Sequence, residues 1–210
     1  MIVAAADGSS LDNPGPAGWA WYIDDDTWAA GGWPRGTNNM GELKAVLDVL
    51  RATRDADEPL TILCDSQYAI NCCTKWIPGW KRKGWRKRDG KPVLNRDLLE
   101  PIDEELDGRD LTFEWVKGLA GLAMTEAADH RARAAATAFR DGTPVDHGPG
   151  FGRVDRDPQP QEDVPKPGNG DEQERLFDLL ERPATPDQEL IGMLTAKELR
   201  FQEAAAIVHR

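Results

Sequence analysis

The spacing of apolar residues predicts three strands followed by a helix at the start of this 210-residue chain. Residues 1–7, 17–23 and 27–33 are apolar runs separated by stretches rich in Gly, Pro, Asn and Asp, which is typical of strands joined by turns. Between residues 37 and 54 the apolar positions follow a helical repeat instead, carried by Leu43, Val46, Leu47 and Leu50. The short connections between the three strands favour antiparallel hairpins.

Strands and helices alternate over the next ninety residues. We predict strands at 59–64 and 111–117 and helices at 66–75, 95–106 and 125–140. Strand–helix–strand connections favour parallel pairing. The expected fold is therefore α/β, a mixed five-stranded sheet with three antiparallel strands first, parallel strands after them, and helices on both faces.

Four acidic residues stand at the edges of four different predicted elements: Asp7, Glu42, Asp65 and Asp129. In open sheets of this kind, polar sites gather at the carboxyl ends of parallel strands, where we place Asp7 and Asp65. Carboxylate oxygens that converged there would suit a hard divalent cation such as Mg²⁺. Each acid alone could equally be a helix cap or a solvated charge, so the pattern predicts a metal site only if the four meet.

The composition changes after residue 140. Residues 1–140 carry a net charge of −4 and residues 141–210 a net charge of −7. We expect a globular domain at 1–140, a disordered or extended Pro/Gly/acidic linker at 141–170, and a helical tail at 171–210 whose role is open and which could recruit a protein partner. Nothing at the N-terminus resembles a signal peptide and no apolar run would span a membrane, so we expect a cytoplasmic protein that makes no membrane contact.

Basic and aromatic residues alternate between residues 75 and 88. Seven cations and no acid lie between Ser66 and Arg88, and three tryptophans are interleaved among them. Such a segment is typical of a surface that neutralises phosphates and stacks on nucleic acid. Trp76 or Trp80 could instead belong to the core. The other five tryptophans lie on predicted strands, where we expect packing roles: Trp19, Trp21, Trp28, Trp33 and Trp115.

Seven strings of residues, in order over about residues 1–140, resemble bacterial type 1 ribonuclease H. They are D-G-S-S-L-D-N-P-G-P-A-G-W, T-N-N-M-G-E-L-K-A, C-D-S-Q-Y-A-I, W-I-P-G-W-K-R-K-G-W, K-P-V-L-N-R-D-L, W-V-K-G and D-x-x-A-R-A-A-A. The resemblance implies an enzyme that hydrolyses the RNA strand of RNA–DNA hybrids, and it implies the mixed-sheet fold. It makes Asp7, Glu42, Asp65 and Asp129 the catalytic metal ligands for two Mg²⁺ ions, with Mn²⁺ able to substitute.

The same resemblance implies where the hybrid binds. Ser10, Asn13, Asn39 and Gln67 would span the minor groove, where the 2′-hydroxyl distinguishes RNA from DNA. Thr37 and Asn38 would help to hold a phosphate of the DNA strand. The basic segment would be the family's handle, which grips the DNA strand through Trp76, Trp80, Lys81, Lys83 and Trp85.

One loop departs from the family pattern. Where the family carries K-G-H-A-G-H, this chain reads K-G-L-A-G-L, so Leu119 replaces a histidine thought to assist proton transfer or product departure. Because the metals do the core chemistry, we expect a slower enzyme. Two alternatives remain: a hybrid-binding module with weak catalysis, and a nuclease of the same fold that acts on double-stranded RNA or DNA ends. We expect a monomer.

Overall fold

A five-stranded mixed sheet forms the centre of the computed structural model, which describes residues 1–117 and 123–152. The strands lie in the order β3-β2-β1-β4-β5. They are β1 (Ile2–Ser10), β2 (Gly15–Asp24), β3 (Thr27–Gly36), β4 (Leu60–Cys64) and β5 (Leu111–Trp115). The first three pair antiparallel, and β4 joins β1 and β5 in parallel. The predicted fold class is confirmed.

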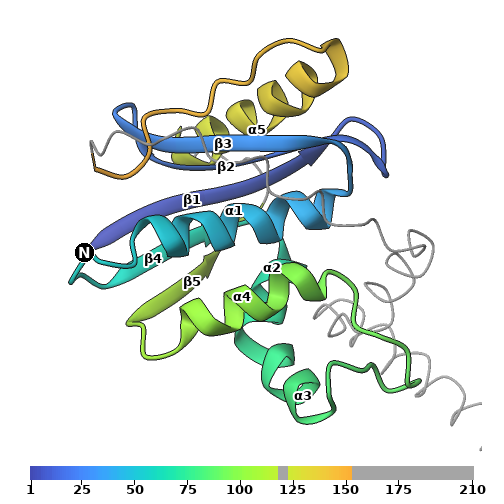
Figure 1. Ribbon diagram of the computed structural model, residues 1–210. Coiled ribbons are helices and arrows are strands. Elements are labelled where there is room, and N and C mark those ends of the chain that lie inside the picture. The colour runs from blue at the N-terminus through green and yellow to red at the C-terminus, as the bar shows by residue number, and fades with distance from the viewer. Residues whose placement is uncertain (118–122, 153–210) are drawn as a thin grey trace, which may run out of the picture. The chain divides into compact units, whose positions relative to one another are not determined.

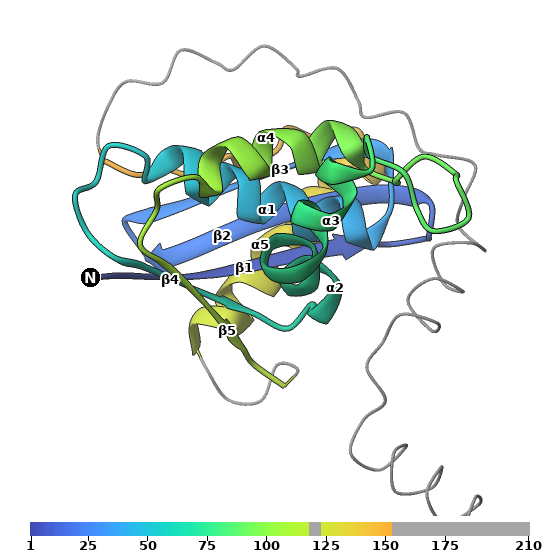
Figure 2. The same cartoon turned by 90° about the horizontal axis from the view of Figure 1, so that it is seen from below.

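Helices cover both faces of the sheet (Figure 1). The helices are α1 (Asn38–Ala52), α2 (Gln67–Asn71), α3 (Ile77–Arg82), α4 (Arg96–Leu106) and α5 (Ala123–Asp141), with a wide π-type turn, η1 (Cys72–Trp76), between α2 and α3. The long helix α5 lies on one face, and α1 with the shorter helices lies on the other, as the view from below also shows (Figure 2). None of the helices among the described residues is both long and apolar enough to span a membrane.

The core is dominated by small residues where α5 meets the sheet. Ala20 and Ala30 of the sheet pack against Ala132 and Ala135 of α5, and all four are buried. Small side chains let a helix approach a sheet closely, which explains the Ala-rich sequence of α5. On the other face, α1 buries larger side chains, among them Leu43, Val46 and Leu50.

Two of the predicted element ends that differ from the structure lie beside the candidate site residues. Strand β1 does not end at Asp7 but continues to Ser10, because Gly8, Ser9 and Ser10 pair with β2 up to Ala17. The helical segment expected to end near residue 75 continues through η1 and α3 to Arg82. Pro78 does not stop it, because proline is tolerated in the first turn of a helix, which is where Pro78 lies in α3.

The chain after α5 runs back along the free edge of β3. His147 O accepts a hydrogen bond from Ala30 N at 3.2 Å, and Trp28 O accepts one from Gly150 N at 2.9 Å. Residues 142–152, which we expected to belong to a linker, therefore cover an edge strand that would otherwise expose its backbone groups. The rest of the expected linker and the expected tail, 153–210, lies outside the described residues.

Helix α1 approaches the sheet so closely that two glycines are required. A Cβ on Gly8 would lie 2.2 Å from Glu42 N, and a Cβ on Gly41 would lie 2.6 Å from Gly18 O and 2.9 Å from the Cα of Gly8. The backbone of α1 thus rests directly on the backbones of β1 and β2, next to Asp7 and Glu42.

Replacing Gly41 with Ala should lower the free energy of unfolding by about 1–3 kcal/mol, the usual cost of overpacking. Without the close approach the same change would stabilise a helix, because Ala is the better helix former by about 1 kcal/mol. Gly79→Ala is the matched control, since Gly79 is helical and a Cβ there meets nothing within 4 Å. Urea unfolding of both variants measures the effect, and equal midpoints would contradict the packing account.

Candidate active site

Three of the four predicted carboxylates meet at the carboxyl end of β4. One carboxylate oxygen each from Asp7, Glu42 and Asp65 can be chosen so that all lie within 4.8 Å of one another. The sheet explains the first and last of these: β1 and β4 are parallel neighbours paired at Ala5 and Leu63, and continuing that register two residues on sets Asp7 beside Asp65. Glu42 arrives from the first turns of α1.

Local signals in the sequence hold each carboxylate in place. Thr37 is the N-cap of α1, and its hydroxyl accepts a hydrogen bond from Met40 N at 3.2 Å. Ser66 likewise caps α2 by accepting from Ala69 N at 3.2 Å, which fixes the chain directly after Asp65. Asp7 Oδ1 accepts from Gly8 N at 2.8 Å. The caps decide where the helices begin, and hence where Glu42 and Asp65 lie.

The cluster is electrostatically costly in the metal-free protein. Burial, with the nearby charges of Asp65 and Asp129, raises the pKa of Asp7 to about 7. Burial and repulsion by Asp7 raise the pKa of Glu42, whose side chain is fully enclosed. Burial, then Asp129, raises the pKa of Asp65. A divalent cation would relieve the repulsion between these partly desolvated carboxylates. The donor set therefore fits Mg²⁺.

Asp129 is the most peripheral of the four. It lies in α5, acts on Asp7 and Asp65 through its charge, and accepts a hydrogen bond from Arg133 Nη2 at 3.2 Å one turn along the helix. It does not belong to the group of three whose oxygens lie within 4.8 Å of one another. The structure thus brings three predicted ligands together and sets the fourth close enough to raise the pKa of two of them.

The predicted groove residues lie around this cluster. Asn38, at the start of α1, contacts both the turn between β1 and β2 and the cluster: its backbone N–H donates to Asn13 Oδ1 at 3.3 Å and its side chain donates to Glu42 Oε1 at 3.4 Å. Asn13, Asn38 and Gln67 are exposed, and Ser10 and Asn39 are partly exposed. Thr37 differs from this set, because it is buried and its hydroxyl serves as the helix cap.

The basic segment folds around its own tryptophans. Trp76 and Trp80 are in ring contact, with centroids 5.6 Å apart, and Trp76 also meets Tyr68. Trp80 and Trp85 are only 7% and 8% exposed, so they form the interior of the handle and leave Trp76 as its partly exposed ring.

The cations of the handle lie on its surface. Lys81 forms an ion pair with Asp103 of α4 at 2.6 Å, whereas Lys83 is exposed with no ion pair among the described residues. Arg96 lies over the ring of Trp85 at 5.8 Å, which adds a further charge beside the buried tryptophan.

Two residues beside the cluster were not predicted as part of a site. Cys64 is buried, with Sγ 4.0 Å from Glu42 Oε2. Trp115, which we expected to pack in the core, is 47% exposed, and its indole N–H donates to Asp65 O at 3.1 Å. Trp115 reaches Asp65 because β4 and β5 are neighbours and Cys64 is paired with Trp115. A prediction of that pairing would have placed Trp115 beside Asp65. The loop with Leu119 lies outside the described residues.

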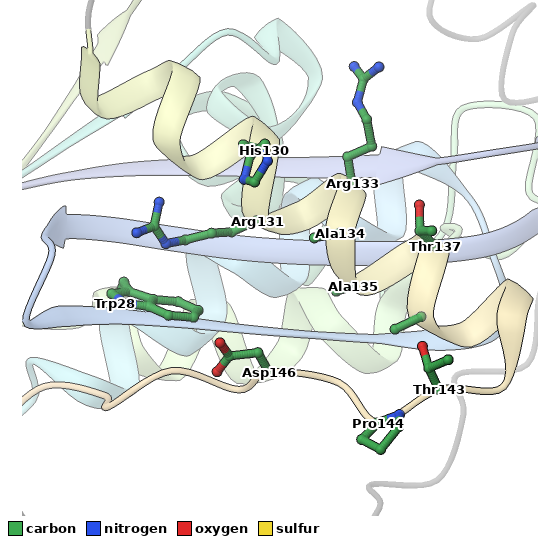
Figure 3. Close-up of a pocket in the computed structure, with 11 residues that line it drawn as sticks. Trp28, His130, Arg131, Arg133, Ala134, Ala135, Thr137, Thr143, Pro144 and Asp146 are labelled. Atoms are coloured by element: carbon green, nitrogen blue, oxygen red, sulfur yellow. The ribbon is translucent and has the colours of Figure 1, made fainter.

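A separate pocket of about 640 Å³ lies between α5 and residues 142–152 (Figure 3). Trp28, Arg131 and Asp146 line it, and none of the clustered carboxylates does. The Arg131 guanidinium is stacked over the rings of Trp28 and Tyr22, at 4.5 and 4.6 Å from their centroids. His130, although next to Asp129 in sequence, faces this pocket. This pocket is thus distinct from the carboxylate cluster.

The ribonuclease H family model matches residues 1–137. A protein of Tropheryma whipplei named ribonuclease H is 51% identical over 150 residues, which are 71% of this chain and 93% of that protein. Ribonuclease HI of Streptomyces coelicolor is 48% identical over 141 residues, 64% of this chain and 61% of that protein.

Solved structures share the fold. A type 1 ribonuclease H with the type 2 active-site motif aligns with a TM-score of 0.56 at 24% identity, over 71% of this chain and 76% of that one. A foamy viral protease-reverse transcriptase in complex with an RNA/DNA hybrid aligns with a TM-score of 0.56 at 18% identity, over 64% of this chain and 20% of that one.

The raised pKa of Asp7 predicts how the stability of the metal-free protein depends on pH. The folded carboxyl holds its proton up to about pH 7, whereas the unfolded one loses it near 3.8, so ionisation favours the unfolded chain as the pH rises through that window. Asp7→Asn removes this penalty. The stability of the variant relative to the parent should rise from about pH 4 to about pH 7 and stay constant above that.

Urea unfolding in the presence of a chelator at several pH values measures that difference. Asp57→Asn is the control, because Asp57 is exposed and away from the cluster. A stability difference for Asp7→Asn that stays constant over the whole range would show that the carboxyl is not held in its protonated form.

Proposed function

The chain belongs to the ribonuclease H family, and on that premise we propose that it is an endonuclease that hydrolyses the RNA strand of RNA–DNA hybrids. The observation that supports this proposal most directly is the convergence of Asp7, Glu42 and Asp65 from three separate elements, with Asp129 acting on two of them through its charge. We further propose that all four act as metal ligands.

In this mechanism the four carboxylates would hold two Mg²⁺ ions, which Mn²⁺ could replace. The bound metals would supply an activated water and relieve the charge on the leaving oxygen of the phosphodiester. The residues of the chain would bind the metals, orient the substrate and compensate the charge of the metals. Glu42 is buried and would offer a fixed carboxylate to the metals, while the exposed Asp65 lies where a phosphate could approach.

Substrate binding would use the polar residues that surround the cluster. Asn13 and Asn38, joined by a hydrogen bond, present amide groups beside Glu42, and Gln67 opens α2 next to Asp65. We propose that Ser10, Asn13, Asn39 and Gln67 follow the minor groove, where donors and acceptors can meet the 2′-hydroxyl. Asn38 and Thr37 would hold a phosphate of the DNA strand, Thr37 by fixing the start of α1.

The handle would grip the DNA strand. Its exposed cations can neutralise phosphates, and the partly exposed Trp76 can lie against a sugar or base. The buried Trp80 and Trp85 would contribute by shaping the segment. Because Lys81 is paired with Asp103, Lys83 should contribute more than Lys81 to phosphate binding.

The chain divides into a catalytic part and a tail in this proposal. We propose that residues 1–140 form the catalytic domain and that 171–210 form a separate tail, able to recruit a protein partner. We also propose that the protein acts as a monomer in the cytoplasm. Residues 142–152, held against β3, would place the beginning of any linker on the edge of the sheet away from β4 and β5.

The proposed activity is tested with labelled RNA–DNA hybrid, double-stranded RNA and double-stranded DNA, each with Mg²⁺ or Mn²⁺. We expect cleavage of the RNA strand of the hybrid alone, abolished by a chelator. Asp65→Asn should reduce the rate by at least about 100-fold, because it removes a charge that would hold the metal, while hybrid binding persists. Hybrid binding without cleavage in either metal would favour the alternative, a hybrid-binding module.

Leu119 gives a second prediction about the same activity. A histidine there would add proton transfer, worth about 10²-fold or more where it operates, so Leu119→His should raise turnover with Mg²⁺. Leu119→Asn is the control, because an amide is polar but does not take up a proton at neutral pH. Equal turnover of the His variant and the parent would mean that the loop does not limit the rate.

A further inference from the structure

Trp115 extends the contact between β4 and β5 by one residue beyond the backbone ladder. The last backbone hydrogen bond of this pair runs from Val116 N to Cys64 O at 3.1 Å. The next carbonyl along β4 is that of Asp65, and it accepts from the Trp115 indole at 3.1 Å. Cys64 and Trp115 are paired residues of parallel neighbours, so both side chains lie on the face of the sheet that α1 and α2 cover.

Asp65 lies between the last backbone hydrogen bond of the β4–β5 pair and the Ser66 cap of α2. It follows the end of β4 and precedes the Ser66 cap, so it belongs neither to the ladder nor to the helix. Its carboxylate interacts with its own backbone N–H. The indole bonds to the Asp65 carbonyl, on the other side of the Cα, so it restrains the Cα from which the carboxylate projects.

The burial of Trp115 separates this role from packing. The side chain is 47% exposed, whereas Trp21 and Trp33 of the same sheet are 0% and 5% exposed. An indole that packs a core would be enclosed, and one that is held at its N–H can remain open to solvent on the ring. The indole N–H is a donor only, so its orientation toward a carbonyl is specific.

We propose that Trp115 is a positioning residue that holds Asp65 in the carboxylate cluster through the indole N–H. The inference rests on the proposed function, because it assigns Trp115 a role at the same metal site. Its consequence is that the metal affinity of the cluster depends on a side chain that itself offers no metal ligand. Carboxylates held in place bind a cation more tightly than the same carboxylates on a mobile chain, because less conformational freedom is lost.

Trp115→Phe tests the proposal, because it keeps an aromatic ring and removes the N–H. Mn²⁺ binding without substrate, followed by electron paramagnetic resonance, should weaken by about 3- to 10-fold, the value of one hydrogen bond. Trp115→Leu should weaken it equally. Trp28→Phe is the matched control on the opposite edge strand and should bind as the parent does.

Hydrolysis of the hybrid provides the second readout. The KM for hybrid should stay unchanged in Trp115→Phe, and the loss of kcat at low Mg²⁺ should be recovered at saturating Mg²⁺. The proposal is overturned by unchanged Mn²⁺ binding in Trp115→Phe, with or without a lower melting temperature. It is also overturned by a raised KM that is larger for Leu than for Phe, which would mean that the ring contacts substrate. If the parent cleaves no hybrid, the proposed function fails, and Mn²⁺ binding still decides the role of Trp115.

Discussion

The backbone contact between helix α1 and strand β1 at Gly8 and Gly41 is the constraint on which the site depends. A Cβ on either residue would lie within 3 Å of the other element's backbone. This approach brings the first turns of α1 against the strand that carries Asp7, and Glu42 is the residue after Gly41. A larger residue at either position would move α1 outward and Glu42 with it. The spacing of the carboxylates is thus set by the absence of two side chains as much as by the acids themselves.

The cluster that this contact creates works against the stability of the metal-free protein. Burial and repulsion raise the pKa of Asp7, Glu42 and Asp65, and Glu42 is the most buried of the three. A chain selected for stability alone would replace such acids with neutral residues. Their cost is offset by the rest of the sheet, where the Ala-rich contact with α5 and the large apolar residues of α1 are well packed. A locally unfavourable group on a well-packed scaffold is typical of a functional site.

Periodicity and turn residues were enough to predict the order of strands and helices, because these signals are local. The end of β1 was predicted wrongly, since Gly8, Ser9 and Ser10 have the composition of a turn and only their pairing with β2 makes them a strand. Burial within the handle was left open for Trp76 and Trp80 and was not expected for Trp85, because alternating cations and tryptophans look the same whether the rings face solvent or each other. The exposure of Trp115 depends on which strand lies beside β5, and that is a property of the sheet as a whole.

Because the chain as a whole is acidic, the binding of nucleic acid must rely on local basic surfaces. The chain carries a net charge of −11, so its field at long range repels nucleic acid. The cations of the handle make the local charge positive. The ion pair between Lys81 and Asp103 joins the handle to α4, which packs on α1. The handle is therefore connected through two helices to the element that carries Glu42. A nucleic acid that reached the handle would meet the carboxylates at a spacing set by packed helices. Metal ions held by Asp7, Glu42 and Asp65 would offset the negative charge there.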